Sequence, residues 1–415
     1  MNITQFNLFV VIICFINLIR VAINVIGAEV YDIKEQSRKH DHHYQPLISV
    51  IIPAFNEASC IIRTLTAAAN NDYKNKEIWV VDDGSTDKTV EIVNAFLTTH
   101  DYPFCHLISQ ENGGKSRAIN NAVKNYAKGN LIMVLDADSS LAPTAIGNMV
   151  EHFSNPKVIG MAANVKMMQK WSILGMVQRI EFLTAYRGKS SEDMTKMLYI
   201  IGGVGSTFRR NIMLEAGLYD TDTVTEDIDF TLKAMEKFGN VPFRFGYAAN
   251  CVVYTEPVSR FSSLFKQRFR WKYGRFKAFV KYHSLFFNRN KKYSKTLTWF
   301  TLPQALIQEL FMLIEPAIFL YLQYLIIVHM DFITFINVIT YFSTLTFLSI
   351  SVDKIETFGQ KIILVVILPF VYFGMFLLTI VEYLSLARSI FKTKTLLTNS
   401  DKHANWQHVE RLNDL

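Results

Sequence analysis

Cysteine is scarce in this sequence of 415 residues, and its four copies are far apart. None belongs to a Cys-x-x-Cys pair and no spacing matches a zinc motif, which argues against a zinc module. Scattered single thiols are typical of proteins in a reducing compartment and argue against a disulfide-stabilised secreted fold. The four residues are Cys14, Cys60, Cys105 and Cys251.

The sequence also lacks the Walker A spacing of a P-loop nucleotide-binding protein. Asn112-Gly113-Gly114-Lys115 has glycines and a lysine, but not in the Walker order. Glycines let backbone amides approach a phosphate, a helix start favours anions, and a lysine adds positive charge. Lys115 is therefore a candidate phosphate ligand, and a simple helix-entry turn is the competing interpretation.

Acidic residues are outnumbered by basic ones, 36 to 43, which gives a formal net charge of +7. A basic excess indicates an anionic partner, such as a nucleotide phosphate, an acidic lipid or a nucleic acid. The cytoplasmic face of an ordinary membrane protein is also basic, and this is the commoner source of such a charge.

Long apolar stretches predict membrane segments near both ends of the chain. Residues 6–26 have spanning length and lack a small-residue cleavage site, which predicts an uncleaved anchor. Residues 299–328, 332–352 and 362–383 are three further predicted spans. The first of these contains Gln304, Gln308, Glu309 and Glu315. Such groups either face a wet pathway or pair helices together.

The central part of the chain predicts an α/β fold with a mostly parallel sheet. Short apolar runs at residues 47–52, 78–81, 104–108 and 131–135 alternate with helical patterns at 60–70, 87–96 and 115–126. This alternation is typical of a sheet covered by helices on both faces. Polar residues follow several of the runs, at the strand ends where open α/β sheets bind ligands.

Two pairs of carboxylates stand at predicted strand ends. Asp136 and Asp138 form an Asp-Ala-Asp motif after residues 131–135, and Asp82-Asp83 follow residues 78–81. Alternate residues of an extended segment point the same way, so Asp136 and Asp138 are expected to approach one cation. Oxygen ligands of this kind suit Mg²⁺ or Mn²⁺ together with substrate phosphates.

Two further motifs carry candidate chemistry. In Thr225-Glu226-Asp227 the competing interpretations are an ordinary helix start with acidic first-turn residues, and a general base at Asp227. Gln267-Arg268-Phe269-Arg270-Trp271 combines phosphate-binding guanidinium groups with an aromatic face that suits a sugar ring. Its competing interpretation is an interfacial amphipathic helix.

The order of these motifs resembles that of the processive family-2 glycosyltransferases, which include cellulose, chitin-like, hyaluronan and poly-N-acetylglucosamine synthases. Ile51-Ile52-Pro53-Ala54-Phe55-Asn56-Glu57 and Val80-Val81-Asp82-Asp83-Gly84-Ser85 open the series. Asp136-Ala137-Asp138, Thr225-Glu226-Asp227 and Gln267-x-x-Arg270-Trp271 complete it. The size and the membrane layout look most like the poly-β-1,6-N-acetylglucosamine synthases.

The resemblance implies a nucleotide-sugar domain of the GT-A type, a metal at Asp136 and Asp138, and a base at Asp227. It places uridine beside residues 53–57 and Asp82-Asp83, pyrophosphate beside Lys115 and Arg270, and the acceptor sugar on Trp271, near Ser206. Substrate contacts are implied for Pro53, Ala54, Phe55, Asn56, Glu57, Asp82, Asp83, Lys115, Asp136, Gly202, Gly203, Glu226, Gln267, Arg270 and Trp271.

The expected protein is a multi-pass enzyme of the plasma membrane with a cytoplasmic catalytic domain. It polymerises a UDP-sugar, which the resemblance suggests is UDP-N-acetylglucosamine, and exports the β-linked product. Expected partners are the growing polysaccharide, membrane lipids and accessory export subunits, and no nucleic acid. The alternative is transfer of one sugar to a lipid carrier. The predicted divisions are 1–44 (anchor and linker), 45–260 (GT-A domain), 261–297 (interfacial segment), 298–388 (transmembrane helices) and 389–415 (polar tail).

Overall fold

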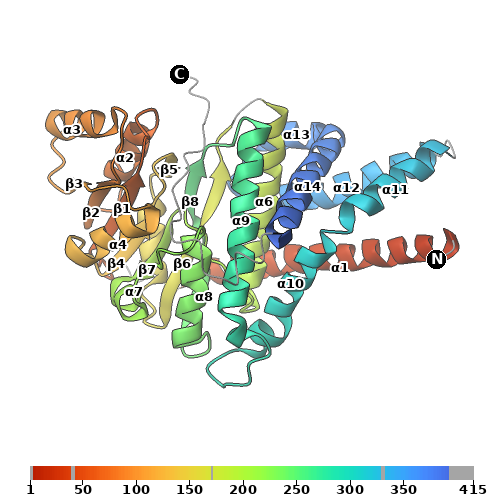
Figure 1. The fold of residues 1–415 in the computed structure, drawn as a ribbon, viewed down its shortest axis with the longest axis horizontal. Helices are drawn as coiled ribbons and strands as arrows, with labels where there is room; N and C mark the ends of the chain where they lie inside the picture. Colours follow the sequence, from red (N-terminus) through yellow and green to blue (C-terminus); the bar gives the residue numbers. More distant parts are fainter. Residues whose placement is uncertain (1–2, 39–42, 170–171, 329–331, 392–415) are drawn as a thin grey trace.

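A computed structural model describes residues 3–38, 43–169, 172–328 and 332–391. An eight-stranded sheet lies at one end, and α1 (Ile3–Gln36) extends to the other end beside a group of C-terminal helices (Figure 1). The order of strands in the sheet is β3-β2-β1-β4-β7-β6-β8-β5. Residues 392–415, most of the predicted polar tail, lie outside the described residues.

The first half of the sheet confirms the predicted alternation of strands and helices. β1 (Ile48–Ala54) pairs in parallel with β2 and β4, and β2 pairs in parallel with β3. All residues of β1 and of β4 are buried, as expected of strands with helices on both faces. The other elements are α2 (Ile61–Ala69), β2 (Lys76–Asp82), α3 (Thr89–Thr99), β3 (Cys105–Ser109), α4 (Lys115–Asn125) and β4 (Leu131–Val134).

The complete sheet is mixed, which corrects the prediction of a mostly parallel one. β7 (Ser206–Arg209) runs antiparallel to both of its neighbours, and β5 (Ser139–Leu141) runs antiparallel to β8. Both strands are short, and their direction is set by antiparallel pairing with their neighbours in the sheet. The long strands β6 (Val158–Met167) and β8 (Arg244–Thr255) pair in parallel, so their carboxyl ends lie at the same edge as those of β1 and β4.

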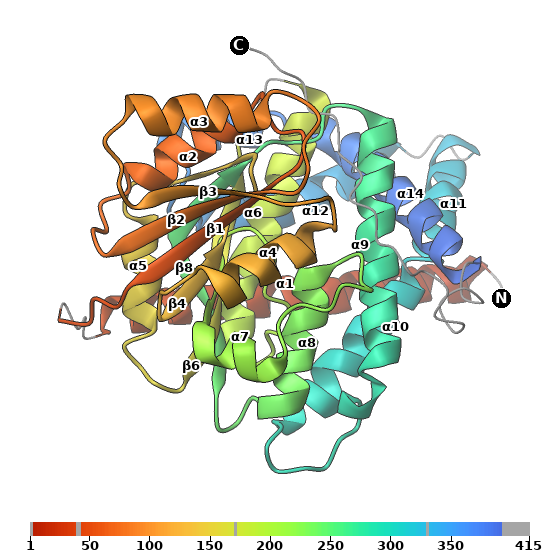
Figure 2. The same ribbon diagram turned by 60° about the vertical axis from the view of Figure 1, so that its left-hand side comes forward.

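Helices cover both faces of the sheet and enclose two apolar cores. One core contains residues of α4, α7 and α8, and the other contains residues of α2, α3 and α5. Figure 2 shows α2 and α3 on one side of the strands and α4, α7 and α8 on the other. The remaining bounds are α5 (Ala145–His152), α7 (Arg210–Ala216) and α8 (Glu226–Phe238).

Two long helices connect the sheet to the rest of the molecule. α6 (Ile173–Met194) follows β6, and α9 (Phe261–Lys281) follows β8 and carries the Gln267–Trp271 motif. α1 packs against α6, where Arg187 contacts Glu29 at 2.6 Å and Asp32 at 2.9 Å. The predicted anchor segment is therefore part of a longer helix whose C-terminal part is fixed to α6.

The predicted multi-helix transmembrane region is not confirmed. Among the described residues one helix, Leu368–Ile390, is long and apolar enough to cross a membrane. Residues Thr296–Phe311 and Glu315–Tyr324 would make a second span only together, and they are bent by 45°. The segment predicted at 362–383 is divided between two helices, where Pro369 begins the second. The C-terminal helices are α10 (Leu302–Phe311), α11 (Glu315–Val328), α12 (Phe332–Ser351), α13 (Phe358–Val366) and α14 (Leu368–Phe391).

A buried ion network joins α9 to these C-terminal helices. Lys272 lies 2.9 Å from Glu309 of α10 and 3.3 Å from Glu382 of α14. Arg275 contacts Glu309 at 2.6 Å, and Arg268 contacts Glu382 at 3.2 Å. Glu309, one of the polar residues in the first predicted span, therefore pairs helices together.

Three ion pairs attach the loop between α12 and α13 to β6, α6 and α1. Two of them are almost fully buried, and the third joins the loop to α1. This loop therefore holds the C-terminal helices close to the carboxyl end of β6. The pairs are Asp353 with Lys166, Glu356 with Arg179, and Lys354 with Asp32.

Candidate active site

Lys115 brings three of the predicted motifs together at the carboxyl edge of the sheet. Its Nζ lies 2.7 Å from Oδ1 of Asp136 and 2.6 Å from Oε1 of Glu226. These two carboxylates outweigh the effect of burial and raise the pKa of Lys115 above its ordinary value. Lys115 is therefore a fixed positive charge between the Asp-Ala-Asp motif and the start of α8.

Asp227 lies beside this cluster, and backbone amides orient both of its carboxylate oxygens. The amide of Gly203 donates to Oδ2 at 2.8 Å, and the amide of Ile228 donates to Oδ1 at 2.9 Å. Burial and the neighbouring charge of Glu226 raise the pKa of Asp227, while Lys115 and the two amides oppose the rise. A half-buried carboxylate with a raised pKa is suited to accept a proton.

Gly203 lies next to both Asp227 and Lys115. A β-carbon at this position would lie 3.5 Å from Asp227 Oδ2 and 3.5 Å from Lys115 Nζ. The glycine pair predicted to lie near the acceptor therefore borders both charged groups. Gly202 faces the hydroxyl of Tyr186, which would lie 3.6 Å from its β-carbon.

Asp83 shapes the loop that presents Lys115. Its side chain is buried, and it accepts hydrogen bonds from the amides of Gly113 at 2.9 Å and Gly114 at 2.7 Å. The Gln110 amide donates a third bond at 2.8 Å. Gly114 has a φ of 87°, a conformation that favours glycine, and α4 begins at the next residue. Asp83 thus fixes the conformation of the predicted phosphate loop directly before the start of α4.

Hydrogen bonds join the end of β1 to the loop after β2. Asn56, at a φ of 58°, accepts a hydrogen bond from the amide of Thr86 at 2.8 Å, and the Ser85 hydroxyl accepts one from the amide of Asn56 at 2.9 Å. Asp82 accepts from the amide of Ser85 at 3.2 Å. Pro53 and Ala54 are buried in β1, while Phe55, Asn56 and Glu57 are half-buried. The structure therefore places the predicted uridine residues side by side at one edge.

The Asp-Ala-Asp motif lies in a turn between β4 and β5, not in an extended segment as predicted. Thr64 fixes this turn by donating to the carbonyl of Ala137 at 2.6 Å, and Arg63 donates to the carbonyl of Asp138 at 3.0 Å. Asp138 is 4% exposed, whereas the side chain of Asp136 is 29% exposed beside Lys115.

A divalent cation at Asp136 and Asp138 would have to complete its coordination with phosphate oxygens. Over the described ranges no group of three or more His, Cys, Asp or Glu side chains is placed to hold a metal. Mg²⁺ typically takes one or two carboxylates together with phosphates and waters, so a pair is sufficient when the nucleotide binds. Asp136 and Asp138 are the candidate ligands for Mg²⁺ or Mn²⁺.

The Gln267–Trp271 motif lies on α9, separate from the Lys115 cluster. Arg270 is exposed, and Trp271 is half-buried next to Phe182, with 6.5 Å between ring centroids. The guanidinium of Arg268 lies over the Trp271 ring at 4.7 Å. The Oε1 atom of Gln267 is buried and accepts no hydrogen bond from the described residues. It is an orphaned polar atom of the kind that a ligand satisfies.

Gly274 connects this helix to the candidate catalytic carboxylates, a contact that the motifs did not reveal. A β-carbon at Gly274 would lie 2.1 Å from Oγ1 of Thr225, the residue directly before Glu226 and Asp227. Since real β-carbons do not approach so closely, α9 rests against the Thr225 loop only because residue 274 is glycine.

We expect Gly274→Ala to lower the rate of sugar transfer by about 10²-fold, because it displaces Thr225 and with it the base. The matched control is Gly147→Ala in α5, where the nearest atom to the new methyl group would lie 3.9 Å away. That change should leave the rate unaltered and stabilise the fold by about 0.5–1 kcal/mol. Transfer rates and thermal melting of both variants test this, and a wild-type rate for Gly274→Ala would contradict it.

Tyr186 and Lys189 of α6 are site residues that sequence reasoning missed. Burial and the charges of Asp227 and Asp136 raise the pKa of Tyr186, which places its hydroxyl near both carboxylates. The ammonium of Lys189 lies over the Tyr186 ring at 4.7 Å. Neither residue belongs to a recognisable motif, and only the packing of α6 against the sheet brings them to the site.

Comparison with known proteins identifies the family. Residues 49–212 match Glycosyl transferase family 2, and residues 131–378 match Glycosyl transferase family group 2. Poly-beta-1,6-N-acetyl-D-glucosamine synthase of Staphylococcus epidermidis is 32% identical over 238 residues, which are 57% of this chain and 56% of that protein. The synthase of the same name from Staphylococcus aureus (strain COL) is 31% identical over 229 residues, 55% of this chain and 54% of that one.

A solved structure shares the fold. It is a mannosyltransferase from Pyrobaculum calidifontis in complex with GDP-Man and Mn²⁺, with a TM-score of 0.58 and 19% identity. The similarity covers 90% of this chain and 99% of that one. The matched region of the curated relatives spans little more than half of their length. The larger of the two family matches covers well over half of this chain, and the chain therefore belongs to the family-2 glycosyltransferases, with a GT-A-like fold.

Proposed function

We propose that this chain polymerises a UDP-sugar, namely UDP-N-acetylglucosamine, into a β-linked polysaccharide and exports it across the plasma membrane. The observation that carries the proposal is the convergence of Asp136, Lys115, Glu226 and Asp227 at the carboxyl edge of the sheet. The names of the staphylococcal relatives support the choice of product, and the nucleotide sugar of the solved neighbour supports the class of donor.

In the proposed reaction Asp227 accepts the proton of the acceptor hydroxyl. The acceptor oxygen then forms a bond to the anomeric carbon as the bond from that carbon to the diphosphate breaks, which inverts the configuration. The diphosphate leaves with both bonding electrons and needs compensating charge, not a proton. Lys115 and Arg270 would supply fixed charge, and a divalent cation held by Asp136 and Asp138 would supply the rest.

The proposed donor site extends along the sheet edge from Asn56 and Asp82 to Asp136. α4 begins at Lys115, beside this edge, and a helix start is a position that favours the diphosphate. Gln267 and Trp271 of α9 would contact the acceptor. The domain limits given by the sequence, 45–260 and 261–297, remain part of the proposal.

The proposed membrane attachment rests on α14 and on exposed apolar side chains of other helices. α1, α11 and α12 present large apolar residues to their surroundings, among them Phe15, Ile327 and Phe332. Helices α10 and α11 would form a broken span with α14 beside them. The catalytic half would then lie in the cytoplasm, where UDP-sugars are made.

The direct experiment is incubation of membranes that contain the chain with individual UDP-sugars. We expect polymer and free UDP from UDP-N-acetylglucosamine, and neither from membranes without the chain. A product that carries one added sugar on a lipid would favour the alternative, a non-processive lipid-carrier transferase. The half-buried Trp271 next to the exposed Arg270 favours the polymerase, because an acceptor sugar needs a stacking surface.

We expect Trp271→Ala to abolish long polymer while hydrolysis of the UDP-sugar stays measurable, because stacking of the acceptor is lost and the donor site remains. Trp299→Ala is the matched control, since Trp299 is 44% exposed and contacts Phe287 instead. Size-exclusion analysis of labelled product provides the measurement. Full-length polymer from Trp271→Ala membranes would contradict the proposed role.

A further inference from the structure

One face of α6 leads away from the candidate base. Arg179, Phe182 and Tyr186 are spaced by three and four residues, so their side chains lie on one side of the helix. At a rise of 1.5 Å per residue, the seven positions from Tyr186 to Arg179 cover about 10 Å. Tyr186 lies at the Asp227 end of this stripe, and Arg179 lies at the end where α6 begins.

The middle of the stripe is aromatic and continues onto α9. The rings of Tyr186 and Phe182 are stacked with 5.7 Å between centroids, and Phe182 is 6.5 Å from Trp271. All three residues are half-buried. A row of half-buried aromatic side chains is a surface on which the apolar faces of successive sugar rings pack.

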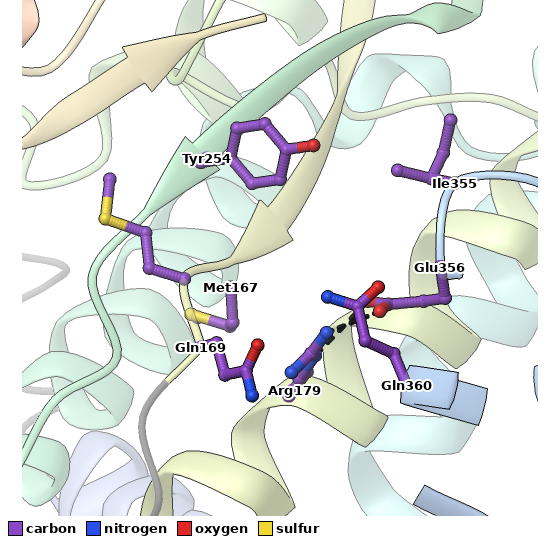
Figure 3. Close-up of a pocket in the computed structure, with 8 residues that line it drawn as sticks. Met167, Gln169, Arg179, Tyr254, Ile355, Glu356 and Gln360 are labelled. Carbon is purple, nitrogen blue, oxygen red and sulfur yellow. Dashed lines mark hydrogen bonds and ion pairs between the residues drawn. The ribbon is translucent and has the colours of Figure 1, made fainter. Parts of the chain in front are cut away.

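At the far end of the stripe lies a cavity of about 250 Å³. Arg179 forms one wall, and the other walls come from the ends of β6 and β8 and from the loop before α13 (Figure 3). Tyr254 of β8 pairs with Ser140 of β5, the strand that directly follows Asp138. The cavity therefore lies at the same sheet edge as the candidate metal ligands. Its lining includes Met167, Gln169, Arg179, Tyr254, Glu356 and Gln360.

The lining is polar but carries no net charge. Arg179 and Glu356 form a two-point ion pair, with the Nε atom 3.2 Å from Oε1, so each neutralises the other (Figure 3). The Oε1 atom of Gln360 accepts hydrogen bonds within the cap of α13, from the Thr357 amide at 2.8 Å, so a ligand would meet its amide donors. Gln169 adds a second amide, and Tyr254 adds a ring with a hydroxyl.

This combination fits a neutral saccharide better than an anion. Amide groups and a phenol bind sugar hydroxyls and acetamido groups, while the Tyr254 ring and Met167 match the apolar face of a pyranose. A free nucleotide or an acidic lipid would need cations without partners, and the cation of this cavity is already paired with Glu356.

We propose that the cavity at Arg179 and Tyr254 is a distal binding site for the growing saccharide, reached along the α6 stripe from the reacting end at Asp227. This inference rests on the proposed function and deepens it, because it gives the enzyme a contact with sugars that have already been joined. A chain held at this second point stays bound while its end is released from Trp271, which is what processive addition requires.

The test compares primers of different length with the full chain in lipid nanodiscs and UDP-N-acetylglucosamine as donor. The wild type should show a lower KM for a β-linked N-acetylglucosamine tetrasaccharide than for the disaccharide. Tyr254→Ala and Gln169→Ala should raise the tetrasaccharide KM about tenfold, the factor that corresponds to roughly 1.4 kcal/mol. Both variants should leave the disaccharide KM and donor hydrolysis unchanged. Gln169 is exposed, so its replacement poses little risk to folding.

Matched controls are Tyr126→Ala and Gln36→Ala, two exposed residues on other elements, which should behave as the wild type. Calorimetric titration of the tetrasaccharide without donor measures the same site independently of turnover. Wild-type KM and affinity in both cavity variants would overturn the inference. Absence of transfer by the wild type would overturn the proposed function instead, and the titration would still decide whether the cavity binds saccharide.

Discussion

Asp227→Asn is expected to lower the turnover of sugar transfer by roughly 10²-fold or more, because the acceptor hydroxyl loses its general base. The amide has nearly the same shape as the carboxylate, so affinity for the UDP-sugar should stay close to that of the wild type. Turnover and donor affinity are measured separately, by UDP release and by equilibrium titration. A comparable loss of donor affinity would make Asp227 a binding residue.

Asp229→Asn, two positions further along α8, is the matched control. Asp229 is buried and contacts Lys281 at 2.9 Å, away from Lys115. Its replacement should lower the melting temperature and leave turnover per folded molecule nearly unchanged. A similar loss of turnover in both variants would point to a general disturbance of α8.

Asp227→Asn should also change the pH profile of sugar transfer. Burial and Glu226 raise the pKa of Asp227, and a base works only in its deprotonated form. Activity of the wild type should therefore fall as the pH drops through this raised pKa, and it should be restored when the pH is increased above it. Lys115, Tyr186 and Lys189 also face the carboxylate, and the Asn variant keeps all three. If the fall in activity at low pH is absent from Asp227→Asn, that fall reports the protonation of Asp227.

Removal of divalent cations is expected to have an effect of similar size. A metal on the leaving diphosphate contributes several kcal/mol to the transition state, so chelation with EDTA should lower the rate by at least about 10²-fold. Added Mg²⁺ or Mn²⁺ should restore it. Asp138→Asn should weaken Mn²⁺ binding in the presence of UDP, measured by paramagnetic resonance, whereas Asp101→Asn, an exposed carboxylate, should not. Full activity in chelator would exclude the metal assignment.

The first half of the fold was predictable from sequence because its elements are local and regular. Apolar runs of strand length alternate with helices up to β4, and each prediction in that region matches an observed element within a few residues. The strands after β4 were not predicted. β5 and β7 are too short to give a periodic signal, and β7 enters the sheet through its pairing with β4 and β6. The mixed character of the sheet is therefore a property of its tertiary pairing.

The candidate site was predictable in its motifs but not in its connections. A strand-end carboxylate pair, an acidic helix start and a glycine-lysine turn mark Asp136, Asp227 and Lys115 in the sequence, yet nothing there shows that Lys115 bridges Asp136 and Glu226. α6 was missed because its charges are paired with other helices. Arg187 contacts α1 and Glu181 contacts Arg268 of α9, so its sequence resembles that of a solvated segment.

The ion network between α9 and the C-terminal helices limits how this enzyme can be divided for study. A chain cut before α10 would lose Glu309 and Glu382, the partners of Lys272, and Arg275 would lose Glu309 as well. Buried charges that lose their partners destabilise a protein by about 3–5 kcal/mol, which is a large part of the stability of an ordinary domain. The catalytic half expressed alone should thus be poorly folded, and exchange of its C-terminal helices between relatives should succeed only when both sides of the network are transferred together.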